Sequence, residues 1–276
     1  MLVLGKIDVS RVICIANRKG GVGKTTTAIN LAAALAVNGE STLLIDCDPQ
    51  GNATSGIGIR LEPDTPTLYD VVLGACALEE ATQATAINKL VVLPANHDLI
   101  GAELELLNID RREYQLQSLL RPSREQYQYI LLDCPPSLGL LTVNALTAAD
   151  SVLVPVQCEY YALEGLRSLL ETLTLIRERL NPDLAIEGIL LTMFDARNKL
   201  CHQVAEEVRR FFPQTVFETV IPRNVRLTES PSHGLPVILY DPSCRGAQSY
   251  LELAREVTRR NPFTWATLPR TEGAAQ

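Results

Sequence analysis

Short apolar runs rich in β-branched residues alternate along this chain with longer stretches of helical periodicity. The short runs predict buried strands at residues 12–16, 42–45, 90–93, 129–132, 151–156, 186–192 and 216–221. The longer stretches predict helices at residues 25–38, 101–120, 138–148, 162–180, 200–212 and 247–260. Strands that alternate with helices of this length indicate an α/β protein, whose mostly parallel sheet carries helices on both faces.

This alternation extends over nearly all of the 276 residues, with no internal repeat and no low-complexity linker. Only residues 1–10 and 261–276 lack a clear pattern. We therefore predict one domain over residues 1–276, with these two end segments peripheral. The sequence contains no run of 18 apolar residues and begins with a stretch too short and too charged for a signal peptide, so we expect a cytoplasmic protein.

Charge and cysteine content narrow the possible functions. The formal net charge of -7 argues against a protein that is basic all over, but it leaves room for a local basic patch. The seven cysteines stand singly, and none forms a C-x-x-C pair. An odd number without such a pair argues against a disulfide framework and against a zinc site. We expect each cysteine to be a small buried hydrophobe in a reducing compartment.

A glycine-rich loop stands between the first predicted strand and the first predicted helix. It reads NRKGGVGKTTT over residues 17–27. Gly20, Gly21 and Gly23 permit close approach of the backbone to phosphate oxygens, which the amide groups and the helix N-terminus attract. Lys24 is placed to neutralise β- and γ-phosphate charge, and the Thr25 hydroxyl is placed to bind Mg²⁺. The loop therefore predicts a nucleoside triphosphate site.

The loop departs from the general G-x-x-x-x-G-K-[ST] pattern. Arg18 occupies the position of the first glycine, and an additional lysine, Lys19, follows it. This second lysine marks the deviant form of the phosphate loop. A second cation near a developing phosphoryl charge lowers the barrier to transfer.

Carboxylates follow two of the predicted strands. Asp46 and Asp48 end the second strand, and Asp133 ends the strand at residues 129–132. The carboxyl ends of parallel strands face the ligand crevice. Asp133 is typical of a Walker B aspartate that holds Mg²⁺ through water, and Asp48 is placed to orient the attacking water. For Asp46, direct catalysis and a supporting or capping role are both open.

Five motifs, in order, resemble the ParA/Soj family of partitioning ATPases: KGGVGKTTTAINLA, DCDPQGNATSG, LLDCPPS, PVQCEYYALEGL and IPRNVRLTESPSHG. They extend from residue 19 to about residue 245. The resemblance implies a doubly wound α/β fold and a Mg²⁺-dependent ATPase of the deviant Walker A type. It also implies an ATP-sandwich homodimer that binds double-stranded DNA nonspecifically. Hydrolysis would be stimulated by a ParB-like partner.

The same resemblance assigns roles to individual residues. Lys19 matches the signature lysine that reaches the partner subunit's nucleotide, and Lys24, Asp48 and Asp133 complete the implied catalytic set. Glu159 matches a position that contacts nucleotide across the dimer. The implied metal ligands are Thr25, Asp48 and Asp133. The implied nucleotide-binding residues are Lys19, Gly20, Gly21, Val22, Gly23, Lys24, Thr25, Thr26, Glu159, Met193, Pro222 and Arg223.

The C-terminal part of the chain carries the expected DNA-binding surface. Residues 195–260 hold ten lysines and arginines against eight acids, whereas the rest holds fifteen against twenty-four. Nonspecific DNA binding needs a cluster of cations near phosphates. Arg197, Arg226 and Arg245 match DNA-contacting regions of the family. Only about ten residues precede the first predicted strand, so we expect no N-terminal DNA-reading domain and no operator-specific repression.

Three other classes remain alternatives. A MinD-like membrane switch would add a C-terminal amphipathic helix, but Pro262 and Pro269 interrupt this tail. An iron protein with a cluster bridging two subunits would use Cys134 and Cys158, whose spacing and Pro-rich context do not fit it. A binding module without catalysis conflicts with the complete set of lysines and aspartates described above.

The family also sets the expected cargo and location. A chromosome or plasmid origin bound by a ParB-like protein is one cargo, and a carboxysome attached through an McdB-like adaptor is another. Both cargoes use the same ATPase core. In either case we expect a protein of the cytoplasm that associates with the nucleoid and does not bind a membrane.

Overall fold

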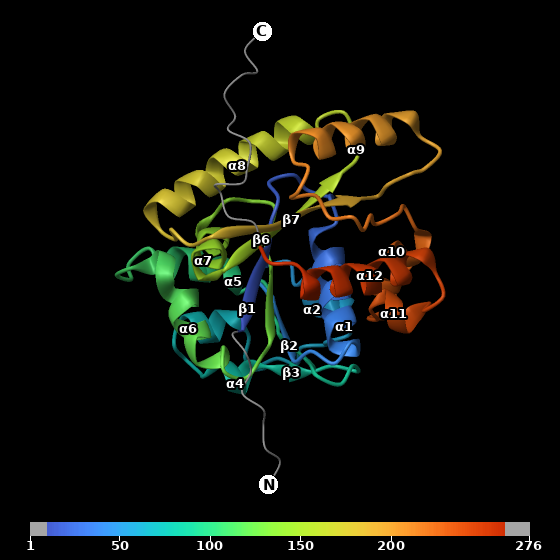
Figure 1. Ribbon diagram of the computed structural model, residues 1–276. Coiled ribbons are helices and arrows are strands. Elements are labelled where there is room, and N and C mark those ends of the chain that lie inside the picture. Colours follow the sequence, from blue (N-terminus) through green and yellow to red (C-terminus); the bar gives the residue numbers. More distant parts are fainter. Residues whose placement is uncertain (1–9, 263–276) are drawn as a thin grey trace.

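The computed structural model describes residues 10–262, which form a seven-stranded sheet between two layers of helices (Figure 1). The strand order is β3-β4-β2-β5-β1-β6-β7. All neighbours pair in parallel except β3, which runs antiparallel to β4. The strands are β1 (Arg11–Ile15), β2 (Thr42–Asp46), β3 (Gln83–Ala84), β4 (Leu90–Leu93), β5 (Tyr129–Asp133), β6 (Ser151–Gln157) and β7 (Ala185–Thr192).

The helices follow the strands in the order that the sequence pattern predicts, with several short ones added. The longer helices are α1 (Lys24–Val37), α5 (Leu99–Leu106), α6 (Gln115–Ser123), α7 (Leu140–Ala148), α8 (Ala162–Arg179), α9 (Lys199–Phe211) and α12 (Arg245–Arg259). The short helices are α2 (Asn52–Gly56), α3 (Leu68–Val72), α4 (Leu78–Ala81), η1 (Arg112–Tyr114), α10 (Val225–Glu229), η2 (Ser230–His233) and α11 (Val237–Tyr240). The expected doubly wound fold class is confirmed.

Both faces of the sheet are buried because successive side chains of a strand point to opposite sides. In β1, Val12 and Cys14 belong to one hydrophobic core, while Ile13 and Ile15 belong to the other. The first core packs under α3 and α5–α9, and the second packs under α1, α11 and α12. These two groups of helices lie on opposite sides of the sheet in Figure 1. Near-continuous apolar strands are therefore the pattern that this fold requires.

The expected helix over residues 101–120 is wrong as a single element. Helix α5 ends at Leu106, and the chain turns before the 3₁₀ turn and α6 begin. Arg111, at the end of this turn, has a left-handed backbone with φ 54°, which no helix interior can accommodate. The buried residues resume at Leu116 and Leu120, so two short helices pack on the sheet where one long helix was expected.

The expected strand at residues 216–221 is also wrong. This segment lies beside β7 but meets its neighbours only at isolated backbone bridges. The backbone amides of Glu218 and Thr219 donate instead to the carboxylate of Glu256 on α12, at 2.8 and 3.0 Å. The Glu256 carboxylate thus accepts two backbone amides that, in a strand, would donate to the neighbouring strand. The sequence pattern does not reveal this competition, because Glu256 lies nearly forty residues further along the chain.

Glu256 is nearly buried and forms an ion pair of 2.7 Å with Arg260. Burial raises the pKa of Glu256, but the amides of residues 218 and 219 and the side chains of Thr219 and Arg260 lower it more, so its pKa lies below the ordinary value of 4.5. Stability from such a group is present above the unfolded pKa and is lost as the pH falls through the folded pKa.

We predict that Glu256→Gln lowers the free energy of unfolding by about 1–3 kcal/mol at neutral pH, because it removes a charged acceptor from buried donors. The difference in stability should become smaller below about pH 4.5. There the parent loses the contribution of Glu256 as well, because this carboxylate takes up a proton when the chain unfolds. Urea unfolding at several pH values measures this. Glu252→Gln, an exposed change on the same helix, is the control. Equal stability of the Glu256→Gln and Glu252→Gln variants at neutral pH would contradict the assignment.

Candidate functional site

The glycine-rich loop connects β1 to α1 and uses glycines where the backbone demands them. Gly21 and Gly23 have φ of 73° and 89°, and Gly23 is the N-cap residue of α1. A Cβ atom added at Gly20 or Gly21 would meet nothing within 4 Å. The loop therefore leaves open space directly in front of the α1 N-terminus, where the amide groups and the helix dipole favour an anion.

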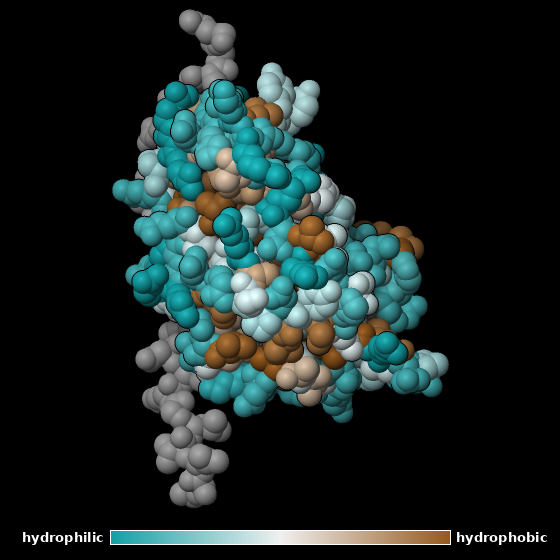
Figure 2. Space-filling model, turned by 90° about the vertical axis from the view of Figure 1, so that its right-hand side faces the viewer, coloured by the Kyte–Doolittle hydropathy of each residue, from teal (hydrophilic) through white to brown (hydrophobic). Residues whose placement is uncertain are grey.

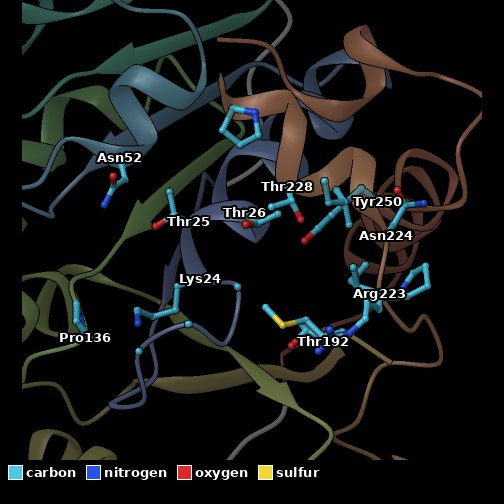
Figure 3. Close-up of a pocket in the computed structure, with 18 of the residues that line it drawn as sticks. Lys24, Thr25, Thr26, Asn52, Pro136, Thr192, Arg223, Asn224, Thr228 and Tyr250 are labelled. Carbon is cyan, nitrogen blue, oxygen red and sulfur yellow. The ribbon is translucent and has the colours of Figure 1, made fainter. Parts of the chain in front are cut away.

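A cleft of about 670 Å³ opens in front of this loop (Figure 3). Its walls come from the α1 N-terminus, the loop after β2, the end of β7, the segment of residues 221–224, α10 and α12. The expected residues that line it are Gly20, Gly21, Gly23, Lys24, Thr25, Thr26, Asp48, Met193, Pro222 and Arg223. The volume and the open loop suit a ligand of nucleotide size.

Val22 lies outside the cleft lining. It is buried, and its backbone oxygen accepts a hydrogen bond of 2.9 Å from the Thr192 hydroxyl at the end of β7. Its role in the structure is to fix the loop to the sheet. Met193 follows Thr192 and has a left-handed backbone with φ 50°, which is uncommon for such a side chain. Met193 also lines the cleft.

Lys24 is only 7% exposed, and its Nζ donates to the Lys19 carbonyl at 3.3 Å. Burial lowers the pKa of Lys24, and the nearby Asp133 opposes this shift. A buried ammonium carries three donors, so one long hydrogen bond leaves it poorly satisfied. An anion in the cleft would supply the missing acceptors.

Two carboxylates end neighbouring strands, since Asp46 and Asp133 are register partners in the pairing of β2 with β5. Both are fully buried. Burial raises the pKa of Asp46 to about 6, against the hydrogen bonds that it accepts. Burial, and then the charge of Asp46, raise the pKa of Asp133 well above its ordinary value. Among the residues that the structure describes, neither carboxylate oxygen of Asp133 has a hydrogen-bond partner.

The acids of the cleft region are suited to bind a hard cation such as Mg²⁺. An orphaned buried carboxylate is costly, and a divalent cation or its bound water would satisfy Asp133. The side chains of Thr25 and Lys24 lie close enough to Asp133 to lower its pKa. Asp48 is 8% exposed and lines the cleft. Thr25, Asp48 and Asp133 thus present oxygen donors, the ligand type that Mg²⁺ prefers.

Lys19 and Glu159 lie outside the cleft lining and form an ion pair with each other. Their side chains are 42% and 34% exposed. The loop around Lys19 is tied to β6 and α8 as well. The Asn17 side chain accepts from the Lys19 amide at 3.0 Å and donates to the Pro155 carbonyl at 2.7 Å, and Arg18 donates to Ser168. The structure therefore brings these two expected nucleotide contacts together, outside the lining of their own cleft.

Two of the three arginines expected to bind DNA are already paired. Arg197 is 89% exposed and makes a two-point contact of 3.1 Å with Asp195. Arg226 contacts Glu229 at 2.8 Å and Asp241 at 3.2 Å. Arg245, the first residue of α12, is exposed.

A second groove of about 610 Å³ brings Arg197 and Arg245 together with Arg223. Arg226 lies outside its lining, on α10. The side of the molecule that carries α10 and α11 is mostly hydrophilic, with hydrophobic residues gathered mainly in its lower part (Figure 2).

Several residues of the cleft were not expected from the sequence. Asn224 caps α10 by accepting from the Arg226 amide at 2.8 Å, and an Asn before a short helical stretch is a signal that could have revealed it. Tyr250 on α12 also lines the cleft, and its hydroxyl lies 3.2 Å from that of Thr27 on α1. No local pattern indicates such a contact between residues more than two hundred positions apart.

In the described part of the chain, the cysteines do not form the site that an iron protein would need. Cys134 lies 3.3 Å from Cys14, with both sulfurs buried, and Cys158 lies elsewhere beside Cys201. Within residues 10–262 no group of three or more His, Cys, Asp or Glu side chains is arranged to hold a metal directly. Five of the seven cysteines are buried as expected, while Cys76 and Cys244 are partly exposed.

No helix in the described part of the chain is long and apolar enough to cross a membrane. The tail on which the amphipathic-helix alternative depends lies mostly in residues 263–276, outside the described residues.

Comparison with known proteins shows which family the chain resembles. A family model described as an AAA domain matches residues 10–186. The chromosome partitioning protein ParA of Myxococcus xanthus is 58% identical over 93% of this chain and 91% of its own length. The sporulation initiation inhibitor protein Soj of Bacillus subtilis is 56% identical over 90% of this chain and 98% of its own length.

A solved structure with the same fold carries a ligand. It is described as cobyrinic acid a,c-diamide synthase from Mycobacterium smegmatis with bound ADP and magnesium. It superposes with a TM-score of 0.80 and 36% identity, covering 93% of this chain and 99% of that one. The sequence relatives match nearly their whole length at more than half identity, and the deviant phosphate loop lies where the fold requires it. The chain therefore belongs to the ParA/Soj family of chromosome-partitioning ATPases.

Proposed function

We propose that this chain binds Mg-ATP in the cleft and hydrolyses it to ADP and phosphate, as the ATPase of a partitioning system. The observation that carries the proposal is the unpartnered carboxylate of Asp133, buried beside Lys24 in front of an open phosphate loop. A buried acid and a buried ammonium without full sets of partners are costly unless a ligand completes them. The related structure with bound ADP and magnesium supports the choice of ligand.

The residues of the cleft divide the chemistry between them. Lys24 and the loop amides would hold the phosphates and offset their charge. Mg²⁺, held by Thr25 and by Asp133 through water, would supply Lewis-acid stabilisation of the developing phosphoryl charge. Asp48, in the wall of the cleft, would orient the attacking water. Met193, Pro222 and Arg223, which also line the cleft, would contact the base.

Dimerisation would give Lys19 and Glu159 their second role. In the single chain these residues form an ion pair with each other, away from their own cleft. Exposed ion pairs contribute only about 0–1 kcal/mol, so this contact can open at little cost. A second subunit facing the cleft would offer Lys19 a nucleotide phosphate, a stronger partner than a solvated carboxylate. We infer an ATP-dependent homodimer in which Lys19 and Glu159 act across the interface.

The basic residues near α10 and α12 would bind the backbone of double-stranded DNA without sequence preference. Arg197, Arg223 and Arg245 share one groove, and Arg226 lies on α10, whose N-cap residue Asn224 lines the same groove. One protomer offers few cations, so a single chain should bind weakly. Two linked protomers on one duplex gain through effective concentration, which would make DNA binding depend on ATP. Such a protein would reside on the nucleoid.

The biological role would follow from cycles of DNA binding and release. A stimulating partner, either ParB-like on a chromosome or plasmid origin or McdB-like on a carboxysome, would accelerate hydrolysis and release the dimer from DNA. The relatives named for chromosome partitioning favour the ParB-like partner and a DNA cargo.

We predict that Lys24→Ala weakens Mg-ATP binding about thirtyfold or more, because losing one partner of a buried charged pair costs about 2–5 kcal/mol. Isothermal titration calorimetry with a slowly hydrolysed analogue measures this. Lys89→Ala, at the opposite end of the sheet before β4, is the matched control. Parent-like affinity in the Lys24→Ala variant would show that the loop is not the phosphate site.

Asp48→Ala should bind Mg-ATP, fail to hydrolyse it and accumulate as a dimer, because it keeps the phosphate ligands and loses the group that orients water. Adding Lys19→Gln to this variant should return it to monomer. Light scattering after gel filtration with Mg-ATP distinguishes the two states, and Asp64→Ala, in an exposed loop outside the cleft, is the control. A monomeric Asp48→Ala protein at saturating Mg-ATP would refute the sandwich dimer.

Arg226→Glu should weaken DNA binding by the Asp48→Ala dimer and leave ATP affinity unchanged. Because each dimer loses two phosphate contacts, the negative slope of log K against log salt should become shallower by about 1.8. Arg121→Glu, on α6 across the sheet from α12, makes the same charge change as a control. Electrophoretic shifts with unrelated duplexes at several salt concentrations measure both quantities.

Two results would contradict the DNA proposal. Equal shifts with ATP, with ADP and without nucleotide would show that nucleotide does not control DNA binding. Absence of DNA binding by the Asp48→Ala dimer, together with ATP-dependent sedimentation with anionic liposomes, would favour the MinD-like membrane switch.

A further inference from the structure

Asp46, a residue to which the proposed chemistry gives no task, is the most heavily hydrogen-bonded acid of the cleft region. It ends β2 and is fully buried. Its Oδ1 accepts the backbone amide of Asp48 at 3.1 Å. Its Oδ2 accepts both the amide and the hydroxyl of Thr54, each at 2.8 Å. Asp46 does not line the cleft, so it acts on the site only through the groups that it holds.

The groups that Asp46 holds belong to one loop. The Asp48 amide lies at the start of this loop, and Thr54 lies on α2, where the loop has become helix. The Thr54 hydroxyl also accepts from the Ala95 amide at 3.0 Å, just after β4. One carboxylate therefore connects the end of β2, the Asp48 backbone, helix α2 and, through Thr54, the exit of β4.

Two further contacts close this loop onto the sheet. The Cys47 amide donates to the Asp133 carbonyl at 2.9 Å. Gly51 has φ 61°, and a Cβ added there would lie 2.8 Å from the Ala95 carbonyl oxygen, so the backbone of the loop packs directly on the exit of β4. Within the loop, the Asp48 side chain accepts the Gln50 amide at 3.0 Å. The backbone that carries Asp48 is thus held from both ends.

We propose that Asp46 is a positioning residue, which holds the Asp48 loop in its hydrolysis-competent shape before nucleotide or partner arrives. The inference rests on the proposed role of Asp48 in orienting the attacking water. Groups fixed in advance need no reorganisation during the reaction, and a misplacement of about 1 Å can cost about a hundredfold in rate. A partner that stimulates hydrolysis would then act on other parts of the site, such as Lys19, and not by ordering this loop.

The test uses the full chain and a matched pair of substitutions at Thr54. Thr54→Val removes the hydroxyl from the network at nearly constant shape, whereas Thr54→Ser retains the hydroxyl. Asp46→Asn is a third variant, which removes one of the acceptors directly. For each protein, steady-state turnover of Mg-ATP is measured with and without duplex DNA, together with Mg-ATP affinity and melting temperature. All assays are done well below the lowest melting temperature.

We expect Thr54→Val and Asp46→Asn to lower kcat about 10- to 100-fold with and without DNA. Their Mg-ATP affinity should stay within about threefold of the parent, and they should accumulate as ATP-bound dimers. Thr54→Ser should restore turnover to near the parent value. A merely structural role would lower affinity, melting temperature and kcat together, and that pattern in Thr54→Val would overturn the proposal. Unchanged kcat in Thr54→Val would overturn it too.

Failure of the underlying function has a different signature. Turnover by Asp48→Ala equal to that of the parent would remove the role of Asp48 itself, whatever the Thr54 variants do. If Asp46→Asn does not fold, the two Thr54 variants still decide the question, because they leave the carboxylate in place.

Discussion

The parallel pairing of β5 between β1 and β2 is the constraint on which the site depends. In this ladder Asp133 stands opposite Ile15 on one side and opposite Asp46 on the other. Because parallel strands end at the same edge of a sheet, the glycine loop after Ile15, the Asp48 loop after Asp46 and the unpartnered Asp133 are brought together. A slip of one residue in either pairing would turn each side chain of β5 to the opposite face. The buried apolar residues on both faces fix that register.

The same pairing creates an electrostatic cost that the chain alone does not relieve. Asp46 satisfies its carboxylate with three protein donors, whereas Asp133, its register partner, has none among the described residues. Lys24 is buried nearby with a lowered pKa. The hydrogen-bonding capacity of Asp46 is thus met within the fold, whereas that of Asp133 would be met only by a ligand. A ligand that binds only the folded chain stabilises it by mass action, so nucleotide and cation would contribute to stability as well as to chemistry.

The sequence predicts most of the site because the signals are local. A glycine loop between a strand and a helix, and an acid at the end of an apolar strand, each lie within a dozen residues. Most of what the sequence does not predict depends on residues far apart in the chain. The segment at residues 216–221 has the apolar pattern of a strand, yet two of its amides donate to Glu256. The turn at Arg111 is a local exception, which depends on a left-handed residue that is not glycine. The pairing of Lys19 with Glu159 joins positions 140 residues apart, and only the neighbouring strands β1 and β6 bring them together.

The arrangement of the two cavities bears on how nucleotide and DNA would influence each other. Residues 222–224 line both the nucleotide cleft and the arginine groove. Their backbone is fixed to the turn after β7, because the Arg223 amide donates to the Phe194 carbonyl at 3.0 Å. Asn224 then caps the helix that carries Arg226. Under the proposed function, a base at one face of this segment and a DNA phosphate at the other would contact the same three residues. The two ligands would therefore share one wall, and a change of its shape at one site would be felt at the other.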